Sequence, residues 1–409
     1  MLFWLLALVL LASLAGIGYR QGTIRVAFSL VGILLGALLA GPLGRLVRPL
    51  LVALGVKNPI MAGVLGPLIV FLLFSIIFKV AGFMVHQKVD VHFKYHAGDL
   101  RLALWERLSR RLGLCLGLVN GALYLILISF VIYTFGYWTV QVASDDKDPR
   151  LLRILNRLAQ DEQNAGFVRV ARAVSPMSEI WYDAADLAGL IYNNPLSEAR
   201  LARYPAFLGL AERPEFQDMS SDSQFTELLL RPAPIMEVLD HPRAQAITDN
   251  PDMLKLVWTT TIPNIKDLPV YLETGKSPKY DPEKILGRWN FNVNVTMSLL
   301  RRAKPNISSK EMQTWKRWML ASFAKTTFVA MTDHQAILKN LPATRPTAAV
   351  VVPSAGPQTL KGQWTEALDG KYQLALSGAA KEQSLTAKTD GDRLTIGVEG
   401  LDLVFDRED

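Results

Sequence analysis

Four long apolar runs fill the first third of this 409-residue chain. They are Leu2–Ile17, Val26–Leu43, Ile60–Val85 and Leu112–Val140. A helix needs about 20 apolar residues to cross the hydrocarbon core of a bilayer. The first run is short and the fourth is long, so we expect tilt or overhang at the membrane surface. The sequence therefore predicts a block of four membrane-spanning helices in residues 1–143, with the lipid bilayer as a partner.

The first run could instead be a cleavable signal peptide. Such a peptide begins with basic residues and has a short apolar core. Here no basic residue precedes the core, which runs unbroken from Leu2 to Ala12 and beyond. A first membrane-spanning helix is the favoured interpretation.

The net charge of +7 does not by itself indicate nucleic-acid binding. The arginines cluster beside apolar segments, as membrane-edge anchors do, and we find no basic-aromatic module. We therefore expect no nucleic-acid partner. The single cysteine, Cys115, excludes a disulfide within the chain.

Lysine and arginine favour the cytoplasmic side of a membrane. Counting them in the loops gives eight on one side and seven on the other, with six in the third loop alone. The eight are Arg20, Arg25, Lys88, Lys94, Arg101, Arg107, Arg110 and Arg111; the seven are Arg45, Arg48, Lys57, Lys147, Arg150, Arg153 and Arg157. This count predicts that both termini lie outside the cytoplasm.

Small residues recur every four positions in two of the runs. Gly32, Gly36, Ala40 and Gly44 form one ladder, and Gly113, Gly117 and Gly121 form the other. This spacing places small residues on one helix face, where two backbones can approach closely. We expect these helices to pack tightly, either within the chain or between copies.

Two segments carry a recognisable pattern: residues 13–25, followed by an apolar span that ends in Ala40, and residues 111–121, which open the fourth span. Both segments resemble the CvpA (colicin V production protein) family. Members of this family often have an acidic residue in the first span, and this chain has none there. They also often have an arginine near the position that Asn120 occupies in this chain. The candidate motif and packing residues are Gly18, Arg20, Gly22, Arg25, Gly32, Gly36, Gly113, Gly117, Asn120 and Gly121.

This resemblance implies a four-helix protein of the inner membrane, linked to envelope physiology and to toxin production or export. It implies no agreed enzymatic activity. In family members with an added domain, that domain lies outside the cytoplasm, in agreement with the charge count.

Polar residues inside a membrane are functional candidates. The spans contain Ser29, Ser75, Asn120 and Ser129, and we find no ionisable group at mid-depth. Asn120 lies beside a glycine ladder, so we expect it to form a hydrogen bond between helices. A channel or transporter is the alternative interpretation.

His92 and His96 lie four residues apart in the third loop, a spacing that could bind a metal ion on a helix. No cysteine or second histidine pair supports that interpretation. Histidines of an interfacial helix explain the pattern better, so we expect neither a metal nor a cofactor.

Residues 144–282 have the composition of a water-soluble helical segment, with an internal repeat at a period of 28 residues. Pro214 and Pro242 suit first helical turns, while Asp222 and Asn250 suit N-caps. The pattern resembles the short helical repeats of STI1-type co-chaperone modules, which implies an apolar groove for partner segments. A plain helical subdomain is the alternative.

The sequence pattern of residues 283–409 predicts a small antiparallel β domain, either a barrel or a half-barrel. Alternating strands are separated by Asp369-Gly370, Asp390-Gly391 and Glu399-Gly400, which are hairpin signals. A helix is expected at residues 308–324. The Gly-x-Trp sequences that begin at Gly287 and Gly362 resemble the strand openings of lipocalin-like folds. This resemblance implies a barrel whose mouth could hold an apolar ligand. The alternative is a small barrel whose interior is filled by its own side chains.

The sequence as a whole predicts an α+β membrane protein without enzymatic activity. The helical and β regions that follow the membrane block would form an interaction module that contacts other proteins. Self-association through the glycine ladders is a further expectation. A membrane-tethered enzyme is an alternative, although only His241 and His334 lie outside the membrane region as possible general bases.

Overall fold

The computed structural model divides the chain into two compact units, which we describe separately. One consists of Met1–Gly189 with Pro232–Leu254, and the other of Leu190–Arg231 with Lys255–Asp409. The structure describes residues 1–56, 59–96, 98–144, 147–194, 196–231, 233–342, 358–367, 370–378, 382–398 and 401–408.

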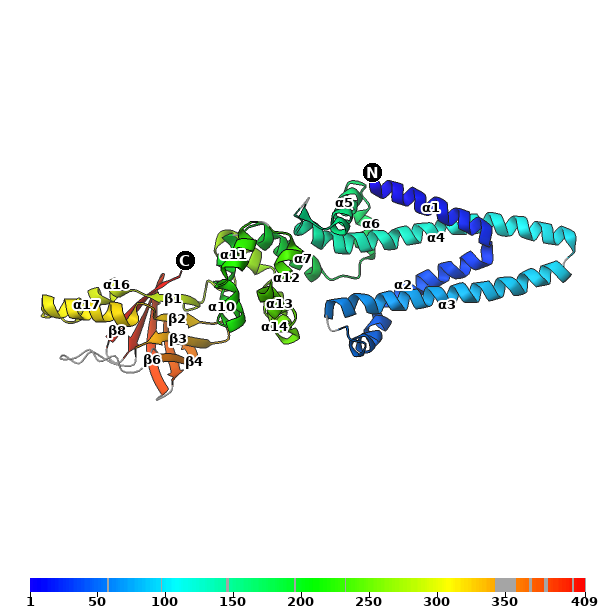
Figure 1. Cartoon of the computed structure of the whole chain (residues 1–409). Helices are drawn as coiled ribbons and strands as arrows, with labels where there is room; N and C mark the ends of the chain where they lie inside the picture. The colour runs from blue at the N-terminus through cyan, green and yellow to red at the C-terminus, as the bar shows by residue number, and fades with distance from the viewer. Residues whose placement is uncertain are drawn as a thin grey trace. The chain divides into compact units, whose positions relative to one another are not determined.

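Four long apolar helices open the first unit and confirm the predicted membrane block. They are α1 (Leu2–Gln21), α2 (Thr23–Ala53), α3 (Pro59–His96) and α4 (Asp99–Gln141). Helix α1 lies along α4, and α2 lies along α3 (Figure 1, blue to cyan). All four are long and apolar enough to cross a bilayer.

Helices α3 and α4 extend beyond the length that a bilayer requires. The 43 residues of α4 span about 65 Å, against a hydrocarbon thickness of about 30 Å. At one end of the pair, the rings of Phe93 and Trp105 stack with centroids 4.8 Å apart. The excess length at the other end of α4 packs against protein.

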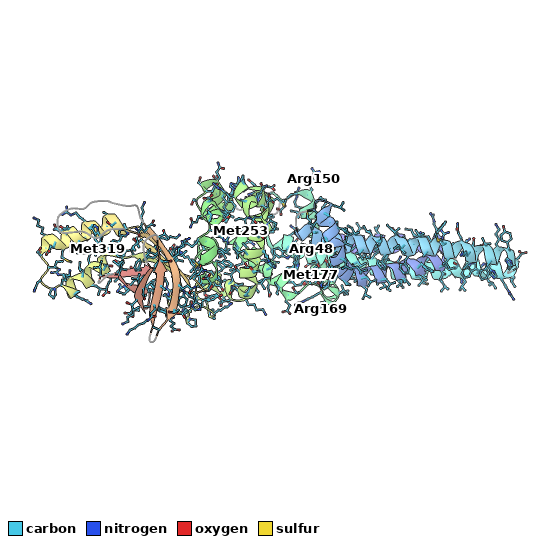
Figure 2. All side chains as sticks on the ribbon, turned by 90° about the horizontal axis from the view of Figure 1, so that it is seen from below. Arg48, Arg150, Arg169, Met177, Met253 and Met319 are labelled. Carbon is cyan, nitrogen blue, oxygen red and sulfur yellow. The ribbon has the colours of Figure 1, made fainter. Side chains whose placement is uncertain are left out.

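Three helices cover the C-terminal end of α4. They are α5 (Arg150–Asn164), α6 (Val168–Val174) and α7 (Glu179–Asn193). Figure 2 labels Arg150 at the start of α5 and Arg169 on α6. Aromatic pairs join α4 to α7, with Trp138 and Trp181 at 5.3 Å. This packing explains why the fourth apolar run is long.

The helices of the repeat region begin where the sequence predicted. Pro214 and Pro242 occupy the first turns of α10 and α13. The Asp222 side chain accepts hydrogen bonds from the backbone N–H groups of Gln224 and Phe225 and caps α11. Asn250 accepts equivalent bonds at the start of α14. The helices and 3-10 turns of residues 196–274 are α8 (Leu196–Leu201), η2 (Pro205–Phe207), α9 (Leu208–Ala211), α10 (Pro214–Ser220), α11 (Ser223–Leu230), α12 (Ile235–Asp240), α13 (Pro242–Thr248), α14 (Pro251–Thr261), η3 (Ile262–Asn264) and α15 (Asp267–Thr274).

A closed antiparallel barrel of eight strands forms the C-terminal part of the second unit. Each strand pairs with its neighbour in sequence, and β1 pairs with β8 to close the barrel. The strands are β1 (Gly287–Phe291), β2 (Thr327–Ala330), β3 (Gln335–Leu341), β4 (Gln358–Glu366), β5 (Lys371–Ser377), β6 (Glu382–Asp390), β7 (Arg393–Val398) and β8 (Leu401–Arg407).

Alternation along the strands fills the barrel with its own side chains. On β5, Tyr372, Leu374 and Leu376 are buried while the residues between them are exposed. Trp289 and Trp364 are fully buried in the same core. Helices α16 (Val293–Ala303) and α17 (Ser309–Phe323) add Met297 and Met319 to this core; Met319 is labelled in Figure 2. The interior is therefore a packed core.

Where the structure describes these residues, it confirms the predicted hairpin turn and the predicted helix start in this region. The Asp390-Gly391 turn joins β6 to β7, with Gly391 at a positive φ. Ser308 and Glu311 form the expected capping box of α17. Asp369 and the Glu399-Gly400 pair lie outside the described residues. Strands β2 and β3 and helix α16 were not predicted.

Helix α9 docks on the outer face of the barrel. Leu208 packs against Val329 and Met331, and its neighbour Glu212 forms ion pairs with Arg288 on β1 (2.8 Å) and with Lys339 on β3. The Glu212 side chain is only 7% exposed. Helix α9 and the barrel are thus joined by apolar contact and by charge.

Glu212→Gln is expected to lower the free energy of unfolding of this unit by about 2 kcal/mol, because two half-buried cations lose their common carboxylate. Chemical denaturation of the full chain, followed by circular dichroism, measures this change. Glu227→Gln is the control, since Glu227 is exposed on α11. Equal stability of the two variants would contradict the role assigned to Glu212.

Candidate functional site in the membrane-spanning helices

The glycine ladder of α4 packs against α1 of the same chain. A Cβ atom added to Gly18 would clash with the Gly113 carbonyl oxygen and lie 2.9 Å from the Gly117 Cα. One added to Gly117 would lie 2.5 Å from the Leu14 carbonyl oxygen. The two backbones are therefore in direct contact along this ladder, which ends at Gly121 beside Leu11.

The ladder of α2 packs against α3 in the same way. A Cβ added at Gly32 would lie 2.7 Å from Phe78 Cβ, and one at Gly44 would lie 2.6 Å from the Pro67 nitrogen. Gly36 faces Phe71. Both ladders thus contact helices within the chain, which is one of the two arrangements that their spacing predicted.

The corner between α1 and α2 is attached to the other two helices. Gly22 has a φ of +79°, a conformation that favours glycine. The Thr23 hydroxyl donates to the Ser109 carbonyl oxygen on α4 at 2.9 Å. The Arg25 guanidinium lies over the Phe83 ring on α3, 4.8 Å from its centroid. Arg20 is exposed.

Asn120 forms the hydrogen bond between helices that the sequence predicted. Its amide donates to the Ser29 hydroxyl on α2 at 3.4 Å, and both residues are buried. Within the described part of the chain, the Asn120 Oδ1 and the buried Ser75 hydroxyl have no hydrogen-bond partner. The four-helix block therefore contains buried polar atoms.

Ser129 contacts an acidic residue that sequence reasoning missed. The Ser129 hydroxyl donates to the Glu162 carboxylate on α5, and both residues are fully buried. Burial raises the pKa of Glu162 to about 7, while the Ser129 hydroxyl acts in the opposite direction. The signal for this residue was present: Glu162 follows Leu155 and Leu158 by seven and four positions, on the apolar stripe of α5.

The histidines considered for other chemistry have defined positions. The rings of His92 and His96 stack 5.2 Å apart on one face of α3, as their spacing predicted. His241 caps α13 through its Nδ1, which accepts from the Arg243 backbone N–H. The His334 ring lies 4.5 Å from that of Trp364.

Comparison with protein families matches residues 4–146 to the family described as Colicin V production protein. Neither the curated proteins nor the solved structures gave a match. The matched region contains nearly all of the four apolar helices, including both glycine ladders and the corner at Gly22. Residues 4–146 therefore match a Colicin V production protein domain, and the four helices that they contain point to a multi-pass protein of the inner membrane.

Proposed function

We propose that this chain is a non-enzymatic inner-membrane protein that holds an interaction module outside the cytoplasm, in the service of toxin production or export or of envelope physiology. The family match supports the link to colicin V production. The observation that carries the proposal is the packed interior of the barrel, because a barrel filled by its own side chains leaves its outer surface for recognition.

Exposed apolar residues on the second unit supply candidate contact points. Trp258 is 44% exposed on α14, Leu230 is 64% exposed on α11 and Leu320 is 48% exposed on α17. Exposed aromatic and aliphatic side chains can anchor a partner when they fill its pockets. The experiment is photo-cross-linking in intact cells, with the full chain labelled at each of these positions and at exposed Lys310 as the control.

The proposal expects discrete protein cross-links at one or more of the three apolar positions and none at Lys310. A second, unlabelled substitution at the same surface should abolish the product. If all four positions give only lipid or no product while purified protein turns over a substrate, the interaction module is not the function.

The proposed orientation, with both termini outside the cytoplasm, is based on the six basic residues of the loop between the third and fourth spans. A reporter enzyme that is active only outside the cytoplasm, fused after Asp409, is expected to be active. Fusion of the same reporter within that loop, after Gly98, is expected to be inactive. An expressed but inactive C-terminal fusion would reverse the proposed orientation.

A channel or transporter is the second candidate, and the buried polar atoms of Asn120, Ser29 and Ser75 favour it. Flux across vesicles that contain the purified chain distinguishes the two functions. Flux that falls in an Asn120→Leu variant would support a polar path between the helices, whereas an absence of flux would leave the anchor as the function.

A further inference from the structure

Glu162 occupies an unusual position for a carboxylic acid. Its solvent exposure is 0%, and α5 places it against α1 and α4 beside a cluster that includes Phe3, Ile132 and Leu158. One carboxyl oxygen accepts from Ser129, and the other, Oε2, has no partner among the residues that the structure describes. Ser129 belongs to the apolar run of α4, so this acid lies next to a membrane-spanning segment.

The charged and titratable groups around Glu162 do not neutralise it. The neighbouring Asp161 binds the amino group of Met1 at 2.9 Å, on the side of α1. On α4 the titratable group is Tyr133. On α6 it is Arg172, whose charge acts on Tyr133. Tyr182 of α7 lies against Tyr133, 5.4 Å between ring centroids. No cation in the described residues forms an ion pair with Glu162.

A lone carboxylate in an apolar site is costly, because burial removes its hydration shell without supplying a counter-ion. Such a group binds a proton instead of staying ionised. The bond from Ser129 offsets only part of this cost, since one hydroxyl satisfies one of the two oxygens. The geometry therefore favours the neutral acid when α5 is docked.

We propose that Glu162 is a proton-binding site whose occupancy controls the docking of α5 on the α1–α4 pair. The protonated acid fits the apolar site, and α5 packs closely. The ionised acid is stabilised when α5 separates and water reaches the carboxylate. Proton concentration at the membrane surface is thereby coupled to the helices that follow the fourth span.

The direction of the pH dependence follows from linkage. Docking raises the pKa of Glu162 above its ordinary value of 4.5 to about 7. The contribution of the protonated acid to docking is therefore fully present below pH 4.5 and is lost as the pH rises through 7. The docking equilibrium should fall by up to about tenfold per pH unit over this window.

Protonation is tested first, with the full chain in lipid nanodiscs. Infrared titration should show a protonated-carboxyl band that disappears with a midpoint near pH 7. The band should be absent in Glu162→Gln and retained in Glu179→Gln, which removes an exposed acid in the first turn of α7. Ser129→Ala should move the midpoint to higher pH. A carboxylate that stays ionised down to pH 5 would overturn the proposal.

Docking is tested by distances between spin labels on exposed Gln160 of α5 and exposed Leu8 of α1, in a Cys115→Ser background. The distance distribution should broaden by pH 8 in this background and remain narrow in Glu162→Gln. This variant also guards against misfolding, because it should be at least as well packed at pH 8. Titration of Glu162 near pH 7 with no pH-dependent change in distance would overturn the coupling.

Discussion

Gly18→Leu is expected to lower the free energy of unfolding of the membrane-spanning block by more than about 3 kcal/mol. The reason is backbone contact: a side chain at Gly18 would meet the Gly113 carbonyl oxygen and the Gly117 Cα. Neither group can move aside as a flexible side chain could, so α1 must separate from α4. Unfolding of the purified chain in mixed detergent micelles, followed by circular dichroism, measures the loss.

Gly16→Leu is the matched control, because it makes the same change two residues away on the same helix. A Cβ at Gly16 meets nothing within 4 Å. Replacing glycine in a helix by leucine also gains up to about 0.8 kcal/mol of helix propensity. The control should therefore be unchanged or slightly more stable. Similar losses in both variants would show that α1 and α4 are not in backbone contact at Gly18.

Trp289→Ala is expected to cost about 3–5 kcal/mol of barrel stability. Trp289 is fully buried on β1, and its indole N–H donates to the Ile285 carbonyl oxygen at 2.8 Å. The Arg407 guanidinium lies 4.5 Å from the centre of its ring. Truncation leaves a cavity in the core, an unpaired carbonyl and a cation without its aromatic neighbour. Urea denaturation of the full chain, monitored in the β-sheet region of the circular dichroism spectrum, measures the effect.

Trp258→Ala removes the same side chain from a partly exposed position in the same unit. Trp258 retains 44% exposure, so its loss should cost less than about 1 kcal/mol. A Trp289→Ala barrel as stable as the Trp258→Ala protein would mean that β1 does not close the core.

The membrane block was largely predictable because its physics is local. Length and apolar character define a spanning helix, and a spacing of four residues defines a small-residue face. The partner of each face was not predictable. Gly113 and Gly32 look alike in the sequence, yet one contacts α1 and the other contacts α3. The helix that each glycine face contacts depends on how the four helices pack together.

The β domain was predicted where turns carry a conformational signal. Gly391 needs its left-handed φ, and the capping box at Ser308 depends on two nearby side chains. Strand β2 has no such signal, since Thr327–Ala330 follows a helix directly and is defined by its pairing with β1. The Glu212 ion pairs also escaped prediction, because they join residues 76 and more positions apart.

Glu162 shows why the polar content of a membrane block cannot be read from the spans alone. The four apolar runs contain no acid at mid-depth, but a helix outside them presents one to Ser129. A glutamate on an apolar stripe is a detectable pattern in α5. Its partner, however, is 33 residues away, and only the packed structure identifies it.

Among the strands that the structure describes, the pairing of β1 with β8 closes the barrel and leaves no free strand edge. A protein that recruits others by adding a strand needs unpaired backbone groups along such an edge. The partner binding proposed above would therefore use side chains, on the strand faces or on helices such as α17. The same closure protects the domain from edge-to-edge polymerisation with its own copies, a useful property for a module concentrated in the plane of a membrane.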